Sequence, residues 1–126
     1  MKQIYQNFKN SIFVSALGFL SACAGPPASQ SKAEANRFEW SSVKSPIEIS
    51  ECVSQAWESM LIPNFVFVRP LIQGYRIDKT SDLGHLYLSA EIRELPNSSQ
   101  ITVWITNYVW LQSQQDDAKN AVISCL

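Results

Sequence analysis

The chain has 126 residues, with ten basic and eleven acidic side chains and a formal net charge of −1. This length accommodates one domain with one hydrophobic core, at the small end of the range, where a covalent staple adds useful stability. The weakly acidic balance argues against nucleic acid as a partner, because contact with phosphates requires a basic surface.

The first 25 residues have the layout of an export signal. Lys2 and Lys9 provide a basic start, and residues 11–20 form an uncharged, mostly apolar run. A run of this length suits the core of a signal peptide and is too short to span a bilayer, which takes about twenty apolar residues. The residues Leu-Ser-Ala-Cys then end the segment at Cys23.

This segment resembles the signal peptide and lipobox of lipoproteins from Gram-negative bacteria. The resemblance implies cleavage before Cys23, a diacylglycerol group on its sulfur and an acyl group on the new amino terminus, which together give a stable membrane anchor. Because Ala24 follows the cysteine in place of aspartate, the resemblance favours the periplasmic face of the outer membrane; the inner membrane and the cell surface are the alternatives. The other interpretations of the segment are a secretory peptide with a coincidental cysteine and a membrane-inserted hairpin.

Cleavage at this position divides the chain into a signal peptide at 1–22, a lipid-anchored flexible tether at 23–44 and a globular domain at 45–126. Glycine, proline and serine dominate the start of the tether and favour a disordered spacer. Phe38 and Trp40 interrupt its polar composition. We expect these two aromatic residues to pack onto the domain; an exposed partner motif is the alternative.

Two amphipathic helices are predicted at the ends of the globular domain. Ser45 is the expected N-cap of the first helix, Pro46 its first residue, and Glu48 completes a capping box. This helix is expected to end near Met60. The second helix is expected to have Ser113 as its N-cap and to continue to the C-terminus.

Three antiparallel strands are predicted between these helices, at 71–79, 85–94 and 100–110. The apolar stretch at 64–68 is either an edge strand or a buried connector, because Pro70 excludes a central strand. The sequence therefore predicts an α+β fold in which an N-terminal helix, a three-stranded antiparallel meander and a C-terminal helix follow one another. Both helices are expected to pack on one face of the sheet.

The alternation of apolar and polar residues assigns the two faces of the predicted sheet. Pairing the apolar faces places Ile92 opposite Val103 and Ile77 opposite Leu86, and Gly74 is expected to form a bulge. The opposite, outer face then gathers aromatic and charged side chains: Arg76, Asp78, His85, Tyr87, Trp104, Tyr108 and Trp110.

If Cys23 carries lipid, Cys52 and Cys125 are the two remaining cysteines, and each lies on the apolar stripe of a predicted helix. In an oxidising compartment we expect these two residues to form a disulfide. Two buried, unreactive thiols are the alternative. Two cysteines and His85, without close spacing, do not form a metal site, and no cofactor is predicted besides the lipid.

Aromatic side chains on a sheet face are typical of binding surfaces, because they provide large contact areas at low entropic cost. The sequence therefore predicts a non-catalytic interaction module, anchored in the outer membrane, whose partner is an envelope protein or a glycan. One alternative is an envelope enzyme or enzyme inhibitor that uses His85 with Asp78 beside it, although no nucleophile motif accompanies this pair. The other is a structural, self-associating lipoprotein in which the aromatic residues stabilise the sheet. The sequence does not specify the oligomeric state.

Overall fold

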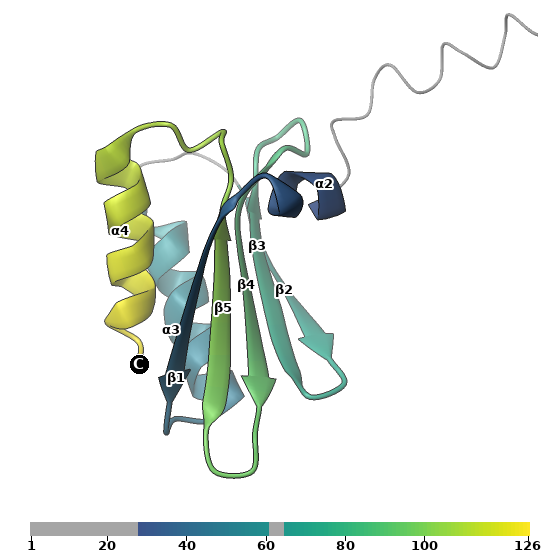
Figure 1. The fold of residues 1–126 in the computed structure, drawn as a ribbon, viewed down its shortest axis with the longest axis vertical. Helices are drawn as coiled ribbons and strands as arrows, with labels where there is room; N and C mark the ends of the chain where they lie inside the picture. The colour runs from purple at the N-terminus through teal and green to yellow at the C-terminus, as the bar shows by residue number, and fades with distance from the viewer. Residues whose placement is uncertain (1–27, 61–64) are drawn as a thin grey trace, which may run out of the picture.

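The computed structural model describes residues 28–60 and 65–126, and the proposed signal peptide and Cys23 lie outside these residues. Within them, five antiparallel strands form one sheet in the order β1-β5-β4-β3-β2 (Figure 1). The elements are α2 (Ala28–Ala33), β1 (Asn36–Ser42), α3 (Pro46–Glu58), β2 (Phe65–Leu71), β3 (Gly74–Thr80), β4 (Leu86–Glu94), β5 (Ser99–Ile105) and α4 (Gln112–Ile123). The predicted α+β class is confirmed, but the predicted number of three strands is wrong.

The first additional strand, β1, comes from the segment predicted as a flexible tether. The prediction is therefore wrong for residues 28–42, which form α2 and β1. Phe38 pairs with Val103 of β5 and Trp40 pairs with Ile101 of β5, so β1 forms one edge of the sheet. Both aromatic side chains pack against the buried core, which confirms the expectation that they fold onto the domain.

The second additional strand, β2, includes the stretch that was predicted as an edge strand or a connector. It lies at the opposite edge of the sheet from β1 and pairs only with β3 among the described strands, which is compatible with Pro70. Leu71 pairs with Gly74 across the turn at Ile72 and Gln73. Gly74 thus follows a hairpin turn and does not form the predicted bulge.

The pairing register between β4 and β5 differs by two residues from the prediction. Ile92 lies opposite Ile101 and not opposite Val103. A shift of two residues keeps every side chain on its face, so the alternating pattern could not exclude it. The turn determines the register, because the backbone N–H of Leu95 donates to the carbonyl of Ser98 over 2.8 Å.

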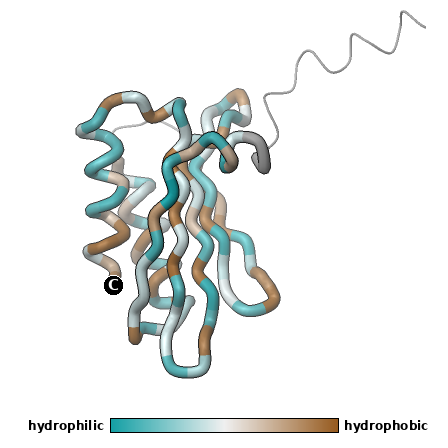
Figure 2. Tube along the Cα trace, in the orientation of Figure 1, coloured by the Kyte–Doolittle hydropathy of each residue, from teal (hydrophilic) through white to brown (hydrophobic). Residues whose placement is uncertain are grey.

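The register between β3 and β4 differs by four residues from the prediction, because Ile77 pairs with Ala90 and not with Leu86. An irregularity between Lys79 and Thr80 shifts the pairing at the end of β3. The predicted faces are nevertheless correct, and Figure 2 shows hydrophobic and hydrophilic residues alternating along the strands.

The helix starts were predicted with different success. Ser45 and Glu48 form the expected capping box at α3, with each side chain accepting from the other's backbone N–H. The predicted N-cap of the last helix, Ser113, lies inside α4, whose N-cap is Leu111 without a side-chain hydrogen bond. The cause is the early end of β5, since the chain turns at residues 106–109 and enters the helix sooner.

One core fills the space between the inner sheet face and the helices α3 and α4, as expected. Trp57 of α3 is fully buried, and its indole N–H donates to the carbonyl of Ala118 in α4 over 3.3 Å. The core consists of Ile49, Val53, Trp57, Ile77, Leu88, Ala90, Ile92, Ile101, Val103, Ile105, Val109, Ala118, Val122 and Cys125.

A disulfide joins α3 to the C-terminal end of the chain. It links Cys52 to Cys125, with 5.7 Å between their Cα atoms, and this is the predicted pairing. Two contacts hold the same end to the chain around β1: Ser42 Oγ donates to the carbonyl of Leu126 over 2.9 Å, and Lys44 Nζ donates to the carbonyl of Cys125 over 3.3 Å.

One charged side chain lies inside the apolar layer. Lys79 is fully buried between the sheet and α3, and its ammonium group donates to the carbonyl of Trp57. Burial lowers the pKa of Lys79, and the negative charge of Glu58 opposes this effect. The carbonyl belongs to the last turn of α3, where the helix dipole favours a cation.

Candidate binding surface

The face of the sheet opposite to α3 and α4, here called the outer face, carries most of the predicted site residues. The short helix α2 lies across one end of this face (Figure 1). Lys32 of α2 contacts Glu91 with an Nζ–Oε1 distance of 3.3 Å, and its Nζ lies 4.2 Å from the ring centroid of Trp104. Part of the predicted tether therefore covers part of the predicted binding surface.

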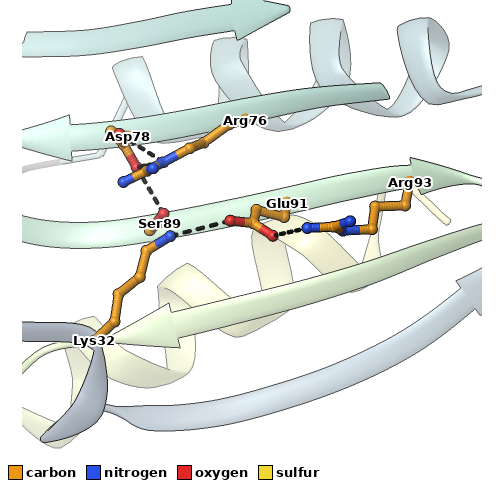
Figure 3. Close-up of polar contacts among 6 residues, drawn as sticks. All are labelled: Lys32, Arg76, Asp78, Ser89, Glu91 and Arg93. Atoms are coloured by element: carbon orange, nitrogen blue, oxygen red, sulfur yellow. Dashed lines mark hydrogen bonds and ion pairs between the residues drawn. The ribbon is translucent and has the colours of Figure 1, made fainter. Parts of the chain in front are cut away.

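Asp78 occupies the centre of a polar contact on the outer face (Figure 3). Its carboxylate accepts from Ser89 Oγ over 2.6 Å and forms an ion pair with Arg76, with an Nε–Oδ2 distance of 3.0 Å. Asp78 is only 5 % exposed. Its carboxylate is thus satisfied by neighbouring side chains.

Glu91 forms the second polar contact of the outer face, between Lys32 and Arg93 (Figure 3). Burial by itself raises the pKa of Glu91, but the hydrogen bonds and charges of Arg93 and Lys32 outweigh burial and hold the pKa below its ordinary value. Burial, with repulsion from Arg76, lowers the pKa of Lys32, while attraction to Glu91 acts in the opposite direction. The Lys32–Glu91 pair therefore fastens α2 to the sheet.

Acid should weaken this contact. Because the native pKa of Glu91 lies below its unfolded value, its ionised form stabilises the fold above about pH 4.5, and this contribution is lost as the pH falls through the lower native pKa. We expect the free energy of unfolding to fall more steeply between about pH 5 and 3 in the wild type than in Glu91→Gln. Urea unfolding at a series of pH values measures both slopes.

The matched control for this prediction is Glu51→Gln, at an exposed position of α3, which should keep the steep slope of the wild type. If Glu91→Gln and the wild type lose stability equally over the acid range, the contact of Glu91 with Lys32 and Arg93 does not contribute to folding.

An aromatic cluster lies beyond the polar contacts, where β4 begins and β5 has ended. The ring centroids of His85 and Tyr108 are 4.8 Å apart, and those of Tyr87 and Tyr108 are 6.3 Å apart in an edge-on arrangement. His85 Nδ1 is buried and has no hydrogen-bond partner within the described residues. Three of the predicted site residues are therefore neighbours.

A hollow of about 200 Å³ lies beside this cluster, between α2 and the turn that follows β5. Its lining residues are Ser31, Glu34, Thr106, Asn107 and Tyr108. The hollow is smaller than the roughly 300–1,000 Å³ of typical small-molecule sites.

The two predicted tryptophans have different surroundings. Trp104 pairs with Ser89 in the sheet and lies under Lys32, so its ring is partly covered. Trp110 was predicted to lie in a strand opposite His85, but β5 ends at Ile105. That prediction is wrong, and Trp110 is instead 76 % exposed in the connection to α4.

The structure thus separates the predicted site into two groups and adds residues that the sequence did not suggest. Arg76 and Asp78 belong to the polar contacts, whereas His85, Tyr87 and Tyr108 form the aromatic cluster. Five residues of the outer face and its rim were not predicted from the sequence: Ser31, Lys32, Glu34, Phe65 and Phe67. No local pattern marks Lys32, because its contact with Glu91 spans 59 residues.

The acid–base pair considered from the sequence is not assembled. In the observed register Asp78 lies opposite Ser89, and Arg76 and Ser89 occupy its carboxylate, so it does not lie beside His85 as predicted. Within residues 28–60 and 65–126, no group of His, Cys, Asp and Glu side chains could hold a metal ion. None of the helices in these ranges has the length and hydrophobicity required to cross a bilayer.

No protein-family model matches the chain, and no curated protein has a significantly similar sequence.

Proposed function

We propose that this chain is a lipoprotein of the bacterial envelope, anchored through lipid on Cys23 at the periplasmic face of the outer membrane. The basic start, the apolar run and the residues Leu20–Cys23 support this proposal. The disulfide between Cys52 and Cys125 also supports it, because structural disulfides persist in oxidising compartments such as the periplasm.

The folded domain is proposed to act as a non-catalytic binding module through the aromatic end of its outer face. The observation that carries this proposal is the gathering of His85, Tyr87 and Tyr108, with an exposed Trp110 two residues after Tyr108 in the chain. Tyr108 is 42 % exposed and Trp110 is 76 % exposed. Exposed aromatic residues supply contact area to a partner, whereas the carboxylates of Asp78 and Glu91 on the same face are already paired with cations.

The geometry favours an envelope protein over a glycan as the partner. The hollow beside Tyr108, of about 200 Å³, is below the roughly 300–1,000 Å³ of typical small-molecule sites. The aromatic end instead has exposed aromatic side chains with the polar contacts of Asp78 and Glu91 on one side, a combination that is typical of protein–protein interfaces.

The double variant Tyr108→Ala/Trp110→Ala tests this function. The wild-type full chain should capture one defined envelope protein from solubilised membranes. We expect the double variant to capture at least about tenfold less of this protein, because truncating aromatic residues at the centre of an interface removes much of the binding energy. The thermal midpoint of the variant should change little, because Trp110 is largely exposed and Tyr108 is not part of the buried core. Quantitative pull-down and thermal unfolding measure the two effects.

The control for this experiment is Val43→Ala, which truncates a side chain that is 90 % exposed and follows Ser42, the partner of Ser99 at the opposite end of β5 from Tyr108. It should capture the partner as the wild type does. Equal capture by the wild type and the aromatic double variant would reject the aromatic end as the binding surface.

A further inference from the structure

The edge strand β2 exposes apolar side chains on both faces of the sheet. Phe65 and Phe67 lie on the outer face and are 57 % and 48 % exposed, and Val68, on the opposite face, is 47 % exposed. Within residues 28–60 and 65–126, no strand pairs with the free side of β2. Sheet edges with these properties pair readily with another chain unless charge, proline or a covering segment prevents it.

The position of the hairpin turn determines which backbone groups of β2 are free. Leu71 and Gly74 close a two-residue turn, so alternate residues from Leu71 backwards bond to β3. The backbone N–H and C=O groups of Val66 and Val68 therefore point away from β3, toward the free edge. The backbone of Pro70 has the same orientation but offers only a C=O group, because proline has no N–H. Another strand can thus form both backbone hydrogen bonds at Val66 and at Val68, whereas Pro70 cannot donate one.

We propose that a second copy of this chain occupies this edge, with β2 antiparallel to β2 and Phe67 opposite the partner's Phe67. In this register Val66 lies opposite the partner's Val68, and each such pair exchanges both of its N–H···O bonds. Two-fold symmetry produces the same exchange a second time. The two sheets then become one continuous sheet.

The partner has to be apolar on both faces of its strand, because β2 exposes apolar side chains on both. The sequence Phe65-Val66-Phe67-Val68 meets this requirement, so the edge is complementary to itself. Phe65 would also lie opposite Arg69 of the partner, where a cation–π contact forms across the strands.

The neighbouring registers are less favourable. Centring the pair on Val68 keeps the number of ladder hydrogen bonds, because Val66 opposite Pro70 forms one bond at each end, but it separates the two Phe67 rings. Centring it on Arg69 places two cations directly opposite each other, which is destabilising. The register centred on Phe67 avoids both problems.

The symmetry of this pairing also suits chains that share one membrane. The two-fold axis is perpendicular to the sheet, because outer-face residues such as Phe67 lie opposite outer-face residues. Both copies of α2 then lie on the same side of the dimer, since α2 lies on the outer face. The first described residues of the two copies, at the start of α2, therefore lie on one side of the dimer.

A pair of edge strands buries less surface than the roughly 1,200–2,000 Å² of a stable interface, so the free dimer is weak. Anchoring of two copies in one membrane raises their effective concentration and strengthens the pairing. The pairing itself does not depend on the partner proposed for the aromatic end.

Cysteine crosslinking of the full chain tests the register. In a pair without ladder hydrogen bonds the Cα atoms lie about 4.5 Å apart, which permits a disulfide. We expect Phe67→Cys, in membranes treated with a mild oxidant, to form a disulfide-linked dimer at least about tenfold more than Val43→Cys, at an exposed control position. Phe65→Cys and Arg69→Cys should each remain monomeric alone and form a heterodimer when the two variants are mixed.

Equal crosslinking at positions 67 and 43 would overturn the proposal, because it would indicate random collision. Dimers of Phe65→Cys alone would overturn the register, and an adduct of a different mass at position 67 would assign the edge to another protein. Adding Val68→Pro to Phe67→Cys removes an outward N–H and should abolish the dimer while far-UV circular dichroism is unchanged. Retention of the dimer in this folded double variant would exclude strand pairing.

Discussion

Replacing Cys52 and Cys125 with serine is expected to lower the free energy of unfolding by about 3–4.5 kcal/mol. The disulfide closes a separation of 73 residues, and a crosslink over that length removes much of the conformational entropy of the unfolded chain. It also joins α3 to the end of the chain, where Ser42 and Lys44 bind the last carbonyls. In a domain of this size the loss corresponds to a fall in thermal midpoint of more than about 12 °C.

Urea unfolding of the double variant measures this loss, and unfolding of the wild type in reductant should reproduce it. Ser124→Ala is the control, because this serine is adjacent to Cys125 but exposed, and the change should stay within about 0.5 kcal/mol. A loss below about 1 kcal/mol in the cysteine variant would show that α3 and α4 are held by packing alone.

The success of the disulfide prediction shows what sequence patterns determine. Cys52 lies on the apolar stripe of α3, Cys125 lies two residues beyond the end of α4, and both helices pack on the same sheet face. Cys52 and Cys125 were therefore predictable as neighbours without knowledge of the strand register. The sheet faces were predictable for the same reason, because alternation alone determines which side chains of a strand face the core.

The strand registers could not be obtained in this way. Shifts of two or four residues leave the faces unchanged, so the apolar pattern fits several registers equally well. The choice depends on turn geometry, such as the Leu95–Ser98 hydrogen bond and the irregularity at Lys79 and Thr80. This is why Asp78 was placed beside His85 when it lies opposite Ser89.

Long-range contacts explain the remaining errors, in the tether and in the candidate site. The strand β1 has only two apolar aromatic residues, Phe38 and Trp40, among polar neighbours, and its pairing with β5 stabilises it. Lys32 likewise has no local signature, because its position on the outer face depends on Glu91 and Trp104. Tertiary contacts thus override weak local propensity in this part of the chain.

Substitution of Gly74 by alanine should have an effect as large as loss of the disulfide. A Cβ atom at this position would lie 1.8 Å from the carbonyl oxygen of Ile92 and 2.9 Å from its carbon. These are backbone atoms of a buried strand, since Ile92 is fully buried and paired with both Tyr75 and Ile101. No rotation of a side chain can relieve such a contact.

The backbone conformation at Gly74 adds to this steric conflict, because its φ of +148° is one that residues with a Cβ rarely adopt. Relief would require β3 to move away from β4, where the N–H of Glu94 donates to the carbonyl of Gln73 over 2.8 Å. We therefore expect Gly74→Ala to lower the free energy of unfolding by about 4 kcal/mol, because overpacking and a strained φ each cost about 1–3 kcal/mol.

Gly84→Ala separates the two causes. Gly84 also has a positive φ, of +85°, but nothing lies within 4 Å of the position of an added Cβ. Its substitution by alanine should lower the free energy of unfolding by only about 1–2 kcal/mol, the cost of placing a residue with a Cβ at a positive φ. Urea unfolding of both variants measures the difference, which isolates the contact with Ile92. Equal losses would mean that the hairpin can shift away from β4 at little cost, and that the close approach of Gly74 to Ile92 does not fix the position of β3.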